Sequence, residues 1–71
     1  MPVSLSSREV VAILREAGWI EIGQEGSHRQ FKHSAKPGRV TVPHPRKDIP
    51  AGTLKSIFRQ AGLDWPPRRN R

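Results

Sequence analysis

The sequence predicts an α+β fold in which two helices cover one face of a three-stranded antiparallel sheet, in the order α-β-β-β-α. Apolar residues recur at helical spacing in 6–17 and 51–61, whereas 19–24, 28–33 and 39–43 read as strands. The connections between these strands are short, which predicts antiparallel pairing. Each helix has one apolar stripe, so we expect both to pack on the same face of the sheet and to leave the other face polar and exposed.

The first predicted helix carries signals at both of its ends. Ser6 and Glu9 have the S-x-x-E spacing of a capping box, in which each side chain pairs with a free backbone N–H of the other. Gly18 suits the left-handed position that ends a helix, and Trp19 can fold back onto the last turn. The predicted buried stripe consists of Val10, Ile13, Leu14 and Ala17.

Side chains alternate between the two faces of each predicted strand. In the first strand, Ile20 and Ile22 share one face, and Trp19 and Glu21 share the other. In the second strand, one face carries His28, Gln30 and Lys32, and the opposite face carries Arg29, Phe31 and His33. Residues 25–27 are predicted to form a turn, and Pro37-Gly38 suits the centre of a type II turn.

The second predicted helix completes a domain that spans residues 1–63 and precedes a basic, proline-rich tail, 64–71. Its apolar stripe consists of Leu54, Ile57, Phe58 and Ala61, and Gly62 is its predicted C-cap. This order of elements is the architecture of double-stranded-RNA-binding domains, so the sequence predicts a fold of that kind.

Charge is the composition's most informative feature. Thirteen Lys and Arg against six Asp and Glu give 71 residues a net charge of +7, which favours a polyanionic partner, above all nucleic acid. Cysteine is absent from the sequence, which excludes disulfides and thiolate metal sites. We expect no signal peptide and no membrane span, and hence a cytoplasmic protein.

Short motifs in a fixed order resemble those of the HicA-type mRNA interferase toxins. They run from Ser4 to Leu63: Glu16-Ala17-Gly18-Trp19, Gly26-Ser27-His28, Val40-Thr41-Val42-Pro43 followed by His44, Gly52-Thr53-Leu54, Ile57 and Gln60-Ala61-Gly62. The resemblance implies a toxin that cleaves RNA without a metal or other cofactor, with His28 as its catalytic residue. It also implies a HicB-type antitoxin partner that binds the toxin and masks His28.

A histidine suits metal-free RNA cleavage because imidazole can take up or release a proton near neutral pH. Basic residues and turn amides are the groups that hold a phosphate. We therefore expect RNA contacts from Gly26, Ser27, Arg29, Lys32, Arg46 and Lys47. Structural interpretations stay open: His28 as an exposed strand-end residue, Gly26 and Ser27 as turn formers, and Arg46 and Lys47 as a solvated loop.

Catalytic roles for His33 and His44, and a metal site shared between histidines, are less favoured. His33 is expected to pack or hydrogen-bond at a strand end and His44 to lie in a loop, although either could be a second acid or base. His28 and His33 point to opposite faces, which disfavours a shared metal ion. Two further functions remain: an RNA-binding module that does not cut, and an inactive or regulatory protein that only binds an antitoxin.

Overall fold

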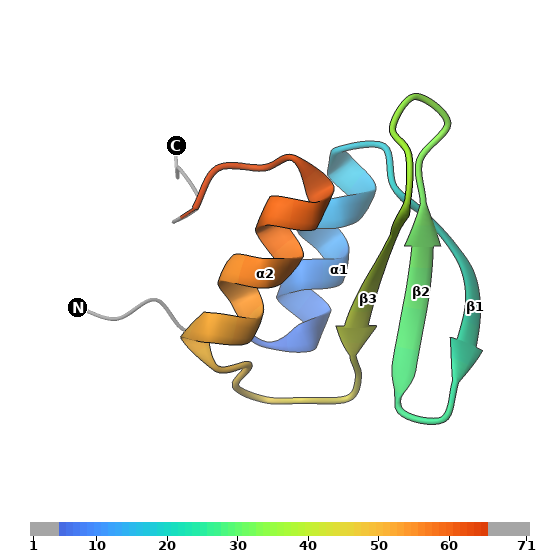
Figure 1. Ribbon diagram of the computed structural model, residues 1–71. Helices are drawn as coiled ribbons and strands as arrows, with labels where there is room; N and C mark the ends of the chain where they lie inside the picture. The colour runs from blue at the N-terminus through green and yellow to red at the C-terminus, as the bar shows by residue number, and fades with distance from the viewer. Residues whose placement is uncertain (1–4, 66–71) are drawn as a thin grey trace.

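The computed structural model describes residues 5–65, and these form two helices and one sheet in the predicted order. The elements are α1 (Ser7–Glu16), β1 (Ile20–Glu25), β2 (His28–Lys32), β3 (Arg39–Pro43) and α2 (Ala51–Ala61). The strands lie in the order β1-β2-β3, and both neighbouring pairs are antiparallel. Both helices lie on one side of this sheet, which confirms the predicted α-β-β-β-α fold (Figure 1).

The ends of α1 form as their sequence signals predict. The Glu9 N–H donates to Ser6 Oγ at 3.1 Å, and the Ser6 N–H donates to Glu9 Oε1 at 2.8 Å, which completes the capping box. After the helix, Gly18 adopts a φ of +96°, in the region that favours glycine. The chain then turns back, and the Trp19 N–H donates to the Leu14 carbonyl at 2.9 Å.

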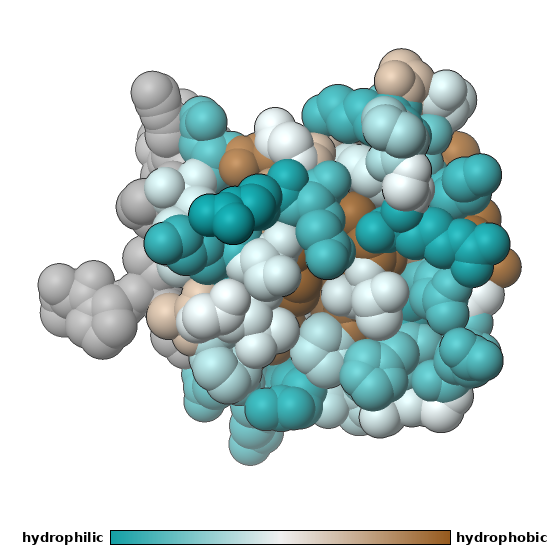
Figure 2. Space-filling view, in the orientation of Figure 1, coloured by the Kyte–Doolittle hydropathy of each residue, from teal (hydrophilic) through white to brown (hydrophobic). Residues whose placement is uncertain are grey.

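The core lies between the helices and strands β2 and β3. Phe31, Val40 and Val42 point from the sheet to the helices and have no exposed surface. The apolar stripes of both helices cover them, which removes this surface from water and stabilises the domain. The helical members of the core are Val10, Val11, Leu14, Leu54, Ile57, Phe58 and Ala61. Hydrophilic residues cover most of the surface seen in Figure 2.

Strand β1 is the least covered part of the sheet. Its register shifts between Glu21 and Gly23, as in a β-bulge. Ile20 and Ile22 are 65% and 47% exposed, whereas Trp19, just before the strand, is 1% exposed. Because Ile20 pairs with Lys32, it lies on the uncovered face, which is therefore less polar than the sequence predicted.

The chain after α2 begins by packing on the domain. Trp65 contacts Phe58 edge to face, with their ring centroids 5.3 Å apart. Residues 66–71, which make up most of the predicted tail, lie outside the described residues. None of the described helices is long and apolar enough to cross a membrane.

Candidate functional site

His28 is the first residue of β2, at the end of the sheet where several loops meet. It is exposed, and it pairs across the sheet with Glu25 of β1 and Pro43 of β3. The β1–β2 turn, the end of β3 and the starts of both helices lie at this same end (Figure 1). The imidazole is therefore accessible on the face that the helices leave uncovered.

The uncovered face beside His28 carries a row of hydrogen-bonded side chains. Arg39 Nη1 of β3 donates to Gln30 Oε1 at 3.0 Å. The Gln30 amide in turn donates from Nε2 to Glu25 Oε1 of β1 at 3.1 Å. This row crosses all three strands, and its Glu25 end lies beside His28, with which Glu25 pairs.

Two of the predicted RNA-binding cations lie away from His28. Lys32 shares the face of His28 but is four residues further along β2, which is about 13 Å in a strand. Arg29 points to the helix side, because neighbouring strand residues alternate, and its Nη1 lies 3.4 Å from Glu21 Oε1. Lys32 and Arg29 therefore leave β2 at a distance from the His28 imidazole, one further along the strand and one on its other face.

The predicted turn before His28 is present as a two-residue hairpin loop. Gly26 has a φ of +59°, which this tight turn requires and which glycine adopts readily. Gln24 Nε2 donates to the Gly26 carbonyl at 3.1 Å. The His44 N–H donates to the Ser27 carbonyl at 2.7 Å, so the turn is tied to the chain that follows β3.

That following segment is anchored to α1 by one buried hydroxyl. Ser7 is 2% exposed, and its Oγ accepts the Arg46 N–H at 3.0 Å and lies 2.7 Å from His44 Nδ1. The Ser7 N–H donates to the Arg46 carbonyl at 2.9 Å. Arg46 and Lys47 are exposed and belong to the segment that follows β3, whose last residue pairs with His28.

His33 has the structural role that the sequence predicted. Its Nδ1 accepts the Ala35 N–H at 2.9 Å, so the ring proton is on Nε2, which donates to the Ala17 carbonyl at 3.1 Å. The ring also packs edge to face on Trp19. Within residues 5–65, no three acidic or histidine side chains are grouped so that they could hold a metal ion.

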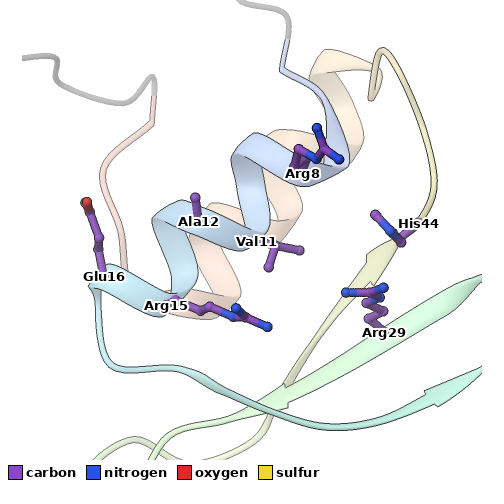
Figure 3. A pocket seen from close by; sticks show the side chains of 7 residues that line it. All are labelled: Arg8, Val11, Ala12, Arg15, Glu16, Arg29 and His44. Carbon is purple, nitrogen blue, oxygen red and sulfur yellow. The ribbon is translucent and has the colours of Figure 1, made fainter.

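A cleft of about 580 Å³ opens between α1 and the helix side of the sheet. Figure 3 shows Arg8 and Arg15 on α1 along one side of it, and Arg29 and His44 across from the helix. The remaining lining residues are Val11, Ala12 and Glu16. Arg8 and Arg15 are seven positions apart, which places them on one side of the helix. That spacing is visible in the sequence, but it does not show which residues of other elements face the two arginines.

The fold and the net charge of +7 define a small basic protein with the architecture of a double-stranded-RNA-binding domain. A family model described as HicA toxin of bacterial toxin–antitoxin matches residues 7–63. A solved HicA3 and HicB3 toxin–antitoxin complex contains a chain with 31% sequence identity and a TM-score of 0.75. The match covers 84% of the present chain and 97% of that chain. Comparison with curated protein sequences gave no match. The chain belongs to the HicA toxin family.

Proposed function

We propose that this toxin is a metal-independent endoribonuclease that cleaves mRNA and uses His28 as its acid or base. The observation that carries the proposal is the position of this imidazole. It stands exposed at the uncovered end of the sheet in a chain with a net charge of +7. An RNA backbone can therefore reach it without any rearrangement of the core. Membership of a toxin family agrees with an activity directed against a cellular polymer.

The reaction requires two proton transfers. The 2′-hydroxyl loses its proton and attacks the adjacent phosphorus, the bond from phosphorus to the 5′-oxygen breaks, and that oxygen takes up a proton. Histidine can serve at either step near neutral pH. Such acid–base catalysis contributes about 10²–10⁴-fold in rate. The remainder comes from holding the phosphate and stabilising its developing charge.

The residues that would hold the RNA differ in their distance from His28. Gly26 and Ser27 form the turn that leads directly into it, and Arg46 and Lys47 are exposed in the segment that His44 ties to this turn. Lys32 and Arg29 lie further along β2 and on its other face. We assign these two side chains to phosphates other than the one that is cut.

We also propose that a HicB-type antitoxin binds this chain and covers His28 in the cytoplasm. The similar solved chain belongs to a HicA3 and HicB3 complex, which supports a partner of this kind. A protein that blocks the exposed end of the sheet would keep RNA from the imidazole. Inhibition by steric masking requires no change in the toxin's fold.

The test is cleavage of labelled RNA in the presence of EDTA by the parent and by His28→Ala. We expect fragments with the parent and none with His28→Ala. Thr41→Ala is the matched control, because Thr41 is exposed and pairs with Gln30 on the same face. Equal cleavage by His28→Ala would contradict the role of His28. Salt-dependent binding by the parent without fragments would instead favour the non-catalytic RNA-binding module.

A further inference from the structure

We propose that the cleft between α1 and the sheet is a second phosphate site, which binds the RNA backbone through Arg8, Arg15, Arg29 and His44. The identity of the ligand as RNA rests on the proposed function. The site itself rests on the presence of these four basic side chains in the lining of one cleft. It lies on the face of the sheet opposite to His28, and it is separate from the groups that would act on the scissile bond.

Three guanidinium groups line the cleft, and two carboxylates lie beside them, Glu16 in the lining and Glu21 in contact with two of the arginines, so one positive charge is in excess. Glu21 Oε1 lies 3.6 Å from Arg15 Nη2 and 3.4 Å from Arg29 Nη1, so one carboxylate draws two cations together. These contacts are long and use one nitrogen of each guanidinium, which leaves other N–H groups for a ligand. Figure 3 shows the Arg15 and Arg29 side chains pointing into the space between helix and sheet.

Arg29 also carries an unsatisfied donor. Its Nε is buried and has no hydrogen-bond partner within the described residues. A buried N–H of a charged group without an acceptor is costly, so a shift of this guanidinium toward an acceptor in the cleft would be favourable. A phosphate oxygen is a suitable acceptor, because guanidinium and phosphate form strong, charge-assisted hydrogen bonds.

The hydroxyl of Ser7 holds the imidazole of His44 at the cleft, where it can contribute to binding an anion. Ser7 Oγ accepts the Arg46 N–H and has one hydrogen of its own to donate. When Ser7 Oγ donates this hydrogen to His44 Nδ1, the neutral imidazole of His44 carries its own proton on Nε2. The imidazole of His44 lines the cleft, and its Nε2–H is then a further donor for an anion.

The two phosphate sites lie close enough for one RNA strand. Arg29 follows His28 directly, and their side chains leave opposite faces of β2. The His44 N–H is bonded to the carbonyl of Ser27, the residue before His28. A strand that passes around this end of the sheet can therefore place one phosphate at His28 and another in the cleft.

The test compares binding of a 2′-O-methylated RNA oligonucleotide by the parent and by Arg8→Gln/Arg15→Gln. This RNA lacks the attacking hydroxyl, so binding is measured whether or not the protein is a nuclease. Lys55→Gln/Arg59→Gln on α2 is the matched control, because it removes the same charge from exposed positions outside the cleft. Circular dichroism verifies that both variants keep the fold.

We expect the cleft variant to raise the Kd for RNA by about ten-fold or more, from loss of hydrogen bonds between charged groups. The slope of log K against log salt should fall by about 1.4, which is two lost contacts on a single strand at about 0.7 each. The control should leave the slope unchanged. If both variants lose RNA affinity equally, binding depends on net charge alone, and the proposed site is wrong.

Three further measurements separate the remaining outcomes. Inorganic phosphate, compared with chloride at equal ionic strength, should compete with RNA for the parent but not for the cleft variant. A poly-glutamate peptide tests the alternative ligand. If it binds more tightly than RNA and loses affinity in the cleft variant, the ligand is an acidic protein segment and RNA is overturned. If the parent fails to cut unmodified RNA but still binds RNA through the cleft arginines, the proposed nuclease activity is wrong and the proposed phosphate site stands.

Discussion

Ser7 and His44 are 37 positions apart in the chain, and their side chains meet with 2.7 Å between Oγ and Nδ1. The same hydroxyl accepts the Arg46 N–H, so a single buried group connects the start of α1 to the segment after β3. This connection orients His44 at the cleft and ties the loop that carries Arg46 and Lys47 to the helix.

Replacing the hydroxyl of Ser7 should destabilise the protein. Ser7→Ala leaves the Arg46 N–H and His44 Nδ1 without their shared partner, and each loss of a buried hydrogen bond costs about 1 kcal/mol. We expect the free energy of unfolding in urea to fall by about 1–2 kcal/mol. Ser56→Ala is the control, because Ser56 is exposed on α2 and should change little. Equal unfolding midpoints for the parent and Ser7→Ala would contradict this account.

Gly18 and Gly52 should respond in opposite directions to alanine. At Gly18, φ is +96°, and a new Cβ would lie 2.7 Å from His33 Nε2, displacing the ring from the Ala17 carbonyl. We expect Gly18→Ala to lower the free energy of unfolding by about 2–3 kcal/mol. Gly52 is in the first turn of α2 with open space around it, so Gly52→Ala should raise stability by about 0.5 kcal/mol. Thermal or urea unfolding of both variants measures the difference, and a neutral Gly18→Ala would count against the close contact.

The three histidines should differ in their reaction with diethyl pyrocarbonate, which modifies accessible neutral imidazole. His28 is exposed and should react first, whereas both nitrogens of His33 are hydrogen-bonded and should react last. In complex with a HicB-type antitoxin, the proposed masking predicts protection of His28. Mass spectrometry of peptides from the free and complexed protein follows each site. Unchanged modification of His28 in the complex would mean that the antitoxin binds elsewhere.

Local signals in the sequence were sufficient for the secondary structure. The capping box at Ser6 and Glu9 and the glycines at 18 and 62 act within a few residues, so their effects did not depend on the rest of the fold. Apolar spacing also identified the buried faces of α2 and β3, whereas in α1 it missed Val11 and included Ile13 and Ala17, which are only partly buried. Strand β1 was harder to interpret, because its bulge and its position at the sheet edge left Ile20 and Ile22 exposed.

Some features of the candidate site could be predicted from the sequence, and others could be found only in the tertiary structure. The sequence by itself determined the α-β-β-β-α order, the basic charge and the exposed position of His28, because these follow from composition, periodicity and side-chain parity. Only the tertiary structure decided which distant groups meet: Ser7 with His44, and the arginines of α1 with Arg29 of β2. Those contacts depend on how the helices lie on a twisted sheet, and the packing of the whole core sets that geometry.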